Sequence, residues 1–403
     1  MGPFFTELQD ALVASGYDVR RVIFNFGDQV FARRRSCIRF AGTLPEWASW
    51  LKAEIANRRP DAIILFGCNR PIHRVAREVA EMNGIPVVSL EEGYLRAGYA
   101  SCESGGNNQH SPMARWRSNQ TFAPQDGAGP SPCNSRFSFV AMCLWGAIYY
   151  LMRDLASKET EEHLYHRQRE RILPLSLGWA AHMLGRVAAR LTEYPTRRVL
   201  RQSPGYLLVP LQVTSDSQLV TAARGWTTDR LIDAVLRAAS TAGCCQKIVF
   251  KLHPLERRSS AMKHLVRKKA RQFGIPRNRL IVLRTGRIGD LTAKASGMIV
   301  INSTSAFSAM HHDVPVLVLG DAVFRHKEIV TLGDDETDVA RFMAVRRAKP
   351  RVQINAFLTE LKARSLIPGG FYGRAERKAA IAAILGRLEK VRTMVQDMRA
   401  AGA

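Results

Sequence analysis

The stretch Ile248-Val249-Phe250-Lys251-Leu252-His253-Pro254 is an apolar run that leads into a Lys-X-His-Pro turn. Its β-branched and aromatic residues predict a buried strand, and the proline, which has no N–H to donate, predicts where that strand ends. The turn would then lie at the carboxyl end of a strand, where open α/β sheets bind their ligands. A lysine and a histidine there suit an anionic phosphate, although an ordinary surface turn can have the same composition.

Similar apolar runs recur along the chain, with segments of helical period between them. In the first half, residues 22–24, 62–66 and 85–90 predict short buried strands. In the second half the corresponding runs are 206–209, 248–250, 280–283, 298–301 and 314–319. Alternating strands and helices predict parallel sheets covered on both faces. We therefore predict an α/β protein with two Rossmann-like domains facing a cleft.

The composition changes between the two halves of the chain. Residues 113–136 are rich in Gly, Pro, Ser and Asn and predict a loop, whereas the residues that follow predict basic helices. The predicted parts are an N-terminal Rossmann-like domain (1–136), a basic helical insertion or linker (137–203), a C-terminal Rossmann-like domain (204–370) and a C-terminal helix (371–403). A helix is already predicted from Phe4, so we expect the first domain either to lack its usual first strand or to have a differently built edge.

The chain has a formal net charge of +24, from 59 Lys and Arg against 35 Asp and Glu. This excess favours anionic partners such as nucleic acid, anionic lipid or acidic sugars, although solvated basic faces explain part of it. We expect no nucleic-acid partner, because no aromatic-basic recognition motif is present. The seven cysteines are scattered and form no CxxC pair, which fits a reducing compartment.

The N-terminus does not resemble a secretory signal, and the sequence predicts no membrane span. The longest uncharged apolar stretch, 139–152, is shorter than the roughly 18 to 20 residues that cross a bilayer. With the basic helices that follow, this stretch could lie on an anionic membrane surface, or it could be a buried helix between domains. We expect a cytoplasmic protein that is peripheral on a membrane.

Polar segments follow several of the predicted strands. Glu91-Glu92-Gly93 could supply acid/base carboxylates or simply begin a helix, and the segment 212–217 contains Asp216 in a Ser-rich setting typical of a helix cap. Glycosyl chemistry commonly uses a pair of carboxylates, and Asp216 could form such a pair with Glu92 if the two lay opposite each other. The segment 302–305 (Asn-Ser-Thr-Ser) offers hydroxyls for a phosphate, although a serine there can also act as a cap.

The sequence lacks the motifs of several other enzyme classes. There is no GxxxxGK[ST], HExxH or GxSxG, and no GxGxxG lies between a strand and a helix. No Asp-X-Asp follows a predicted strand, so we expect no metal site. Cations and hydroxyls are left to stabilise a leaving phosphate.

These segments, in their order along the chain, resemble the capsular polysaccharide biosynthesis/export family of Gram-negative bacteria, in its short, single-module β-Kdo transferase type. The matching residues are 2–5, 24–28, 66–73, 91–96, Glu103 with Gly106 and Asn108, 210–218, 251–256, 302–304 and 370–372. The resemblance implies a GT-B glycosyltransferase with CMP-Kdo as donor substrate and no further cofactor. It implies transfer of β-linked Kdo to a lyso-phosphatidylglycerol-based lipid acceptor at the inner face of the inner membrane.

The resemblance also implies roles for individual residues. Donor and product are both β-linked, so we expect retention through a covalent adduct, with Asp216 as nucleophile and Glu92 or Glu91 as the base. The residues expected to bind the donor are Gln212, Ser217, Lys251, His253, Asn302, Ser303, Thr304 and Ser305. Those expected on the acceptor side are Arg70, His73, Arg96, Glu103 and Asn108.

A different class of function is compatible with the same sequence. The chain could be a non-catalytic export or scaffold protein that binds the glycolipid or the transporter, and Glu92, Asp216 and His253 would then be dispensable. As a transferase, it would act beside the capsule export complex and a companion β-Kdo transferase. The sequence does not decide the exact acceptor, the number of Kdo units added or the oligomeric state.

Overall fold

The computed structural model describes residues 2–32, 36–95, 98–117, 129–156, 172–213, 217–241 and 246–401. The chain forms two compact units. Unit 1 contains Met1–Asn107, Pro124–Pro174 and Glu360–Ala403, and unit 2 contains Asn108–Ala123 and Leu175–Thr359. Each unit is therefore discontinuous in sequence, whereas the predicted domains were continuous. The C-terminal helix belongs to unit 1, and the basic region 137–203 is divided between the units.

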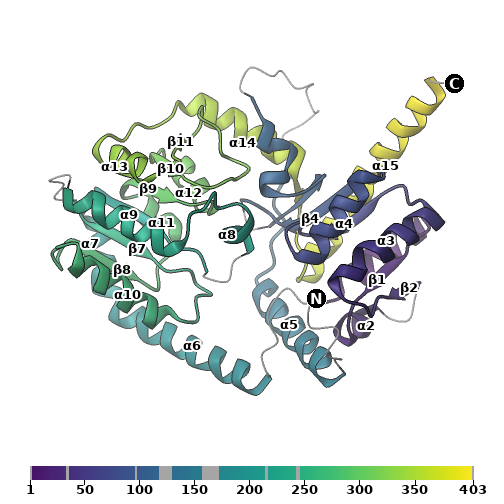
Figure 1. The fold of residues 1–403 in the computed structure, drawn as a ribbon, viewed down its shortest axis with the longest axis horizontal. Coiled ribbons are helices and arrows are strands. Elements are labelled where there is room, and N and C mark those ends of the chain that lie inside the picture. The colour runs from purple at the N-terminus through teal and green to yellow at the C-terminus, as the bar shows by residue number, and fades with distance from the viewer. Residues whose placement is uncertain are drawn as a thin grey trace. The chain divides into compact units, whose positions relative to one another are not determined.

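Unit 2 is built on a six-stranded sheet in the order β11-β10-β9-β6-β7-β8, and all its neighbouring pairs run parallel (Figure 1). Its strands are β6 (Tyr206–Pro210), β7 (Ile248–Lys251), β8 (Leu280–Leu283), β9 (Ala295–Val300), β10 (Val316–Val318) and β11 (Thr331–Leu332). The apolar runs predicted all of these strands except β11. Every residue of β6 and β7 is buried, which explains why these runs are continuously apolar and do not alternate.

Helices supply the partners for these apolar strands. In α9, the residues Leu231, Ile232, Val235 and Leu236 recur at helical spacing and pack with β6 and β7 in one core. The helices of unit 2 are η1 (Asn108–His110), η2 (Pro112–Arg115), α6 (Ile172–Thr192), α7 (Tyr194–Gln202), α8 (Ser217–Thr221), α9 (Thr228–Thr241), α10 (Ser259–Gln272), α11 (Ile288–Thr292), α12 (Ala306–His311), α13 (Glu336–Ala344) and most of α14 (Arg351–Ser365).

Unit 1 has a four-stranded sheet in the order β12-β5-β4-β3 and a separate parallel pair, β1-β2. Its strands are β1 (Arg21–Ile23), β2 (Cys37–Arg39), β3 (Ile63–Phe66), β4 (Val87–Glu92), β5 (Tyr99–Ser104) and β12 (Leu366–Pro368). The α/β class is confirmed, but here only β3 and β4 form a parallel pair within the larger sheet, because β5 and β12 run antiparallel. The short connection between Glu92 and Tyr99 cannot hold a crossover helix, so the chain must turn back.

The two ends of the described chain pack into one core in unit 1. The ring of Phe371 meets those of Phe4 and Phe66 edge-on, each at 4.8 Å between centroids. Arg377 adds an ion pair with Glu7 at 2.8 Å. The helices of this unit are α1 (Phe4–Ala14), α2 (Phe26–Ala32), α3 (Leu44–Arg58), α4 (Pro71–Met82), α5 (Ser138–Leu155) and α15 (Arg374–Ala401).

Among the described residues, no helix combines the length and the apolar character that crossing a bilayer would require.

Candidate functional site

The sheet of unit 2 has its topological switch point between β6 and β9. From β6 the chain adds β7 and β8 on one side, and β9 and β10 lie on the other. Open parallel sheets bind ligands at the carboxyl ends of the strands beside such a point. Gln212 follows β6 and Asn302 follows β9, so both predicted donor residues lie at this edge.

Gln212 and Asn302 are joined directly. The side-chain nitrogen Nε2 of Gln212 donates a hydrogen bond to Oδ1 of Asn302 over 2.8 Å. The buried Asn302 also donates from Nδ2 to the carbonyl of Ala222 at 3.2 Å. The amide of Asn302 is thus held in one orientation, because its oxygen accepts and its nitrogen donates.

The hydroxyls of the row after β9 bond mainly within the row itself. Helix α12 begins at Ala306, and the side chain of its N-cap residue, Ser305, makes no capping hydrogen bond. The hydroxyl oxygens of Ser303 and Ser305 lie 2.8 Å apart, and both residues are half-buried, as is Thr304. The hydroxyl of Ser303 also accepts a hydrogen bond from the backbone N–H of Ser305 at 3.3 Å, so it has a local role in this turn, whereas Ser305 does not cap the helix. A hydroxyl both donates and accepts, so both serines can still bond to a ligand.

Lys251 and His253 follow β7, the strand next to β6. The buried ammonium of Lys251 donates to the carbonyl of Leu252 at 2.7 Å and to that of Arg284 at 3.3 Å. Burial lowers the pKa of Lys251 to about 8, since desolvation disfavours the charged form and nearby arginines add repulsion. The imidazole Nδ1 of His253 accepts a hydrogen bond from the backbone N–H of Leu255 at 3.1 Å. Lys251 and His253 therefore have different partners: the ammonium of Lys251 bonds to the carbonyls of Leu252 and Arg284, whereas the ring of His253 accepts from the backbone of Leu255.

Some predicted residues cannot be placed. Asp216 and Arg96 lie outside the described residues. Ser217 begins α8, and its side chain is not described.

In unit 1, Glu91 and Glu92 are the last residues of β4 and not the start of a helix. They pair with Ser101 and Ala100 of β5, so the interpretation as a helix N-terminus is wrong. Successive strand residues point to opposite faces, and the two carboxylates accordingly have different neighbours. Glu92 is exposed and hydrogen-bonds the hydroxyl of Tyr372, whereas the half-buried Glu91 lies near the guanidinium of Arg70.

Arg70 and His73 lie at the same sheet edge as the two carboxylates. Strands β3 and β4 are parallel, with Phe66 opposite Leu90, and Arg70 precedes α4, which begins after β3. The guanidinium of Arg70 lies over the ring of Phe66 at 5.2 Å from its centroid. Desolvation, helped by the charge of Arg70, lowers the pKa of His73 to about 3, so its imidazole is neutral near pH 7.

Two residues expected on the acceptor side have structural partners elsewhere. Glu103 is buried in β5, where it accepts hydrogen bonds from the hydroxyl of Tyr94 at 2.5 Å and from Nδ2 of Asn107 at 3.2 Å. Asn108 belongs to unit 2, and its Oδ1 accepts from the backbone N–H of Val323 at 3.1 Å. Of the predicted acceptor residues that are described, only Arg70 and His73 lie beside Glu91 and Glu92.

Tyr372 is a further residue at this edge that no sequence pattern predicted. It follows β12, and burial raises its pKa, to which the charge of Glu92 also contributes. Gly369, with φ of 102°, allows the chain to turn here, because a side chain would meet the backbone of Glu376. The segment 370–372 was noticed as a match to the family, but nothing in the sequence indicated that it returns to β4.

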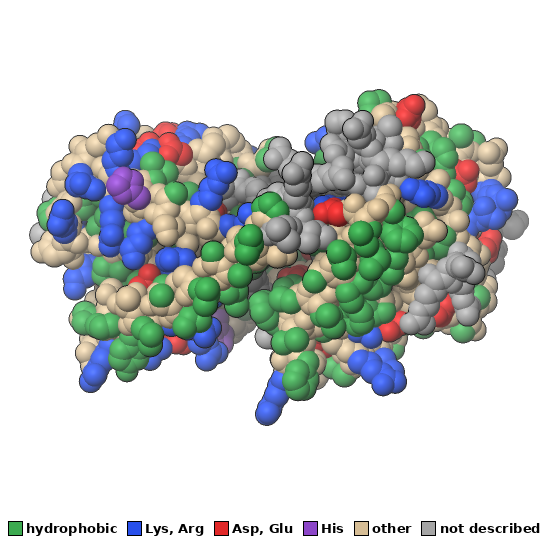
Figure 2. All heavy atoms as spheres, turned by 90° about the horizontal axis from the view of Figure 1, so that it is seen from below, with side chains coloured by type: hydrophobic (Ala, Val, Ile, Leu, Met, Phe, Trp, Pro, Cys, Tyr) green, Lys and Arg blue, Asp and Glu red, His purple; other side chains and the backbone are tan. Residues whose placement is uncertain are grey.

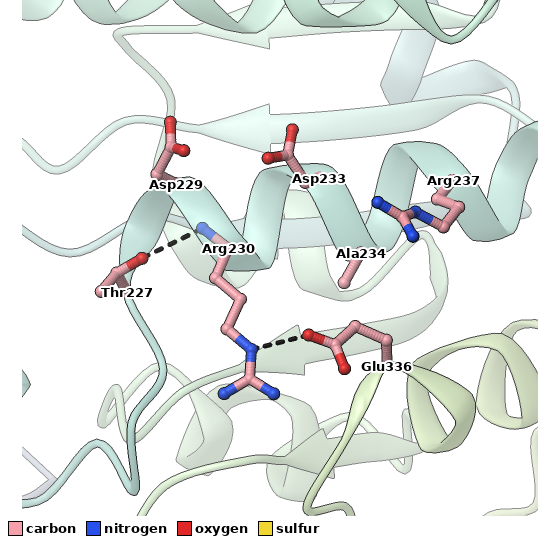
Figure 3. Close-up of a pocket in the computed structure, with 7 residues that line it drawn as sticks. All are labelled: Thr227, Asp229, Arg230, Asp233, Ala234, Arg237 and Glu336. Carbon is pink, nitrogen blue, oxygen red and sulfur yellow. Dashed lines mark hydrogen bonds and ion pairs between the residues drawn. The ribbon is translucent and has the colours of Figure 1, made fainter.

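A recess on the outer side of α9 is not a convincing ligand site. It has a volume of about 270 Å³, and Arg230 crosses it to reach Glu336 at 2.7 Å (Figure 3). Asp229 and Asp233, on the same helix, both pair with Lys269. These charges already satisfy one another. Among the described residues, no cluster of His, Cys, Asp or Glu could hold a metal ion.

Comparisons with known proteins place the chain in a family. Residues 61–372 match the sequence model of the family described as capsule polysaccharide biosynthesis protein, and the chain belongs to this family. It is 28% identical over 344 residues to the capsule polysaccharide export protein KpsS of Escherichia coli, covering 83% of this chain and 86% of that protein. It is 27% identical over 339 residues to the capsule polysaccharide modification protein LipB of Neisseria meningitidis serogroup B, covering 80% and 79%.

Solved structures that resemble this chain were also found. One is Thermosulfurimonas dismutans KpsC, described as a β-Kdo 2,7 transferase, with a TM-score of 0.42 and 12% identity over 93% of this chain and 100% of that one.

Proposed function

We propose that this member of the capsule family is a glycosyltransferase that moves Kdo from CMP-Kdo to a phosphatidylglycerol-based lipid, with its two units in the GT-B arrangement. The observation that carries the proposal is the polar edge of the parallel sheet in unit 2. Gln212, Asn302 and the hydroxyls of Ser303 and Ser305 lie beside the switch point, and the side chain of Ser305 makes no capping hydrogen bond to α12. This chemistry suits a nucleotide sugar whose phosphate leaves.

In this proposal His253, Ser303 and Ser305 bind the CMP phosphate. Negative charge grows on that phosphate as the sugar departs, and donors already in position stabilise it without reorganising. Lys251 has a different part, because its ammonium is bonded to the carbonyls of Leu252 and Arg284. It shapes the turn that carries His253. The donor set needs no metal, so we expect transfer to be unaffected by EDTA.

The acceptor side is assigned to unit 1. Glu92 is the better candidate for the base that activates the acceptor hydroxyl, because it is exposed and its described partner is the neutral Tyr372. Glu91 is half-buried and lies near the guanidinium of Arg70, so it is less accessible to an acceptor hydroxyl than Glu92. Asp216 remains the proposed nucleophile that forms the covalent adduct and so retains the β configuration.

We propose that the lipid acceptor is reached at the inner face of the inner membrane, next to the capsule export complex and a companion β-Kdo transferase. Helix α5 supports a membrane location, since Phe139, Val140 and Leu144 are 56%, 61% and 53% exposed. Apolar side chains of this kind can enter the headgroup region without spanning the bilayer.

The test is transfer by the purified full-length chain with CMP-Kdo and lyso-phosphatidylglycerol. We expect release of CMP and a lipid product heavier by one or more Kdo residues, with the β linkage seen by NMR. In Glu92→Gln protein, intact-mass spectrometry should show a Kdo adduct that maps to Asp216. A scaffold or export protein, as the name of the E. coli relative suggests for that protein, would release no CMP and form no adduct.

A further inference from the structure

Unit 2 has a second cavity that the proposed transfer does not use. It has a volume of about 530 Å³ and lies between α6 and α10. Helix α10 lines it with Lys263, His264, Arg267 and Arg271, and Arg284, just after β8, adds another guanidinium. On the α6 side the lining includes Gly185 and small alanines. The cavity is thus lined by small residues on the α6 side and by basic residues on the α10 side.

The one carboxylate that lines this cavity is already occupied. Glu193 accepts hydrogen bonds from the backbone N–H groups of Arg284 and Thr285 and from the hydroxyl of Thr285, at 2.8 to 3.1 Å. It also lies 3.6 Å from Nζ of Lys263. Within the described part of the chain, no carboxylate forms an ion pair with any of the arginines in and around the cavity, which are Arg186, Arg190, Arg267, Arg271 and Arg284.

These guanidinium groups repel one another. Burial lowers the pKa of Arg186, and the charges of Arg190 and Arg284 lower it further. The Nε of Arg284 is buried and has no hydrogen-bond partner among the described residues. Gly185 makes room for this side chain, since a Cβ there would lie 2.9 Å from Nη2 of Arg284. A phosphate group would relieve the repulsion and accept the unused hydrogen bonds.

The side of α6 that faces away from the core is apolar. Leu177, Leu184 and Leu191 repeat every seven residues and are 65%, 72% and 74% exposed, with Val187 beside them at 55%. Helix α6 has no acidic residue, and in Figure 2 apolar side chains gather along it with lysines and arginines nearby. Ala188, which lines the cavity, is four residues after Leu184 and three before Leu191, so the cavity opens directly beside this stripe.

We infer that this cavity binds the phosphate of an anionic phospholipid while the apolar stripe of α6 lies in the membrane interface. A soluble anion would make use of the arginines alone, whereas a lipid makes use of both the arginines and the leucines beside them. The inference rests on the proposed location at an anionic membrane. It involves none of the residues assigned to transfer, so binding to membranes and release of CMP can be measured separately.

The test is co-sedimentation of the full-length protein with vesicles of phosphatidylcholine alone or with 30% phosphatidylglycerol. The Arg267→Gln/Arg271→Gln protein should bind the anionic vesicles at least 10-fold more weakly, and its preference over neutral vesicles should disappear. The matched control is Arg341→Gln/Arg347→Gln, which removes the same charge from exposed positions elsewhere in unit 2. Leu184→Asn/Leu191→Asn should weaken binding by a similar factor with little loss of stability, because both side chains are exposed.

Several outcomes would overturn the inference. Equal vesicle binding by the cavity variant and its control would show that only net charge matters. Unchanged binding by the leucine variant would show that the stripe does not touch lipid. Calorimetric binding of glycerol 3-phosphate as tight as that of vesicles would identify a site for a soluble anion. If vesicle binding follows the expectation while the wild type releases no CMP from CMP-Kdo, the proposed transfer fails and the lipid site stands.

Discussion

Gln212 and Asn302 come from segments 90 residues apart, and their side chains meet in a 2.8 Å hydrogen bond across the point where the sheet of unit 2 reverses its strand order. The pair orients the Asn302 amide at the strand ends where a nucleotide would bind. This polar contact is the structural basis for the proposed donor site in unit 2.

Asn302→Asp tests this contact with almost no change of shape. The new carboxylate still accepts from Gln212, but it loses the hydrogen bond to Ala222 and brings a negative charge to the proposed phosphate site. We expect kcat/KM for CMP-Kdo to fall by about 100-fold or more, as when a preorganised donor is lost. Asn278→Asp, at an exposed position in unit 2, is the matched control. Similar activities for both variants would contradict a donor site at the switch point.

The strands of unit 2 could be predicted because each one is marked by the residues of its own segment. Each buried strand is a continuous apolar run, and each run ends in polar residues that then lie at one edge of the sheet. The antiparallel strands β5 and β12 were not predicted. Strand β5 contains buried polar residues such as Glu103 and Ser101, which bond to Asn107. Strand β12 has only three residues and reaches β5 from far along the chain. Hydrophobic pattern alone cannot reveal such strands.

Within the candidate site, too, some features follow from the neighbouring sequence and others depend on contacts that only the fold creates. His253 and Lys251 look equivalent in the sequence, but the partners of the ammonium, Leu252 and Arg284, come from two strands and appear only in the fold. Tyr372 could not be assigned at all, because β12 must first add to the sheet edge. The sequence therefore predicts the sheet edge at which the candidate residues lie. It does not predict the hydrogen-bond partners of their side chains.

His253→Ala should reduce turnover by roughly 100-fold or more, because a donor to the leaving phosphate is lost. The protein should remain folded, since the His253 ring has a modest structural part, accepting from the N–H of Leu255. The measurement is CMP release at saturating CMP-Kdo, with circular dichroism as the check of folding. Turnover close to wild type would remove His253 from the mechanism and favour a scaffold function.

Tyr372→Phe deletes the hydroxyl that bonds to Glu92 and leaves the ring in place. A hydrogen bond to a charged group is worth about 1.5–3 kcal/mol, so we expect transfer to fall by about 10-fold or more. Stability should change less than activity, because the partner carboxylate is exposed. Tyr194→Phe, an exposed tyrosine in unit 2, serves as control. If Tyr372→Phe lowered stability and left transfer unchanged, the tyrosine would be structural only.

His73 should make the protein sensitive to mild acid. Its pKa falls from an ordinary 6.5 to about 3 on folding, so between these values the unfolded chain binds the extra proton. The stability from neutral His73 is complete above pH 6.5 and is lost as the pH falls toward 3. Between pH 7 and pH 5 the free energy of unfolding should drop by about 2 kcal/mol from this group alone.

The measurement for His73 is denaturant unfolding at both pH values in wild type and in His73→Gln. The variant should lose about 2 kcal/mol less than wild type over this interval, whatever its stability at pH 7. His311→Gln, at an exposed position, should follow the wild type. Parallel behaviour of His73→Gln and wild type would show that the ring is already protonated or solvated in the folded state.

Glu193 and Glu336 offer a direct comparison of a buried and an exposed carboxylate in unit 2. Glu193 is 5% exposed and holds the turn after β8 through Arg284 and Thr285, whereas Glu336 forms a surface pair with Arg230 (Figure 3). Glu193→Ala should cost roughly 3 kcal/mol, because it leaves buried N–H groups and a nearby lysine without an acceptor. Glu336→Ala should cost at most about 1 kcal/mol, as surface pairs do.

Hydrogen exchange can show whether the loss in Glu193→Ala arises at this turn. The amide of Thr285 donates to Glu193 at 3.0 Å, so its protection should fall more than that of the β6 core amides. Glu193→Gln keeps one acceptor oxygen and should lie between wild type and the alanine variant in both stability and protection. A uniform loss of protection across unit 2, or equal costs for Glu193→Ala and Glu336→Ala, would mean that the turn does not depend on this carboxylate.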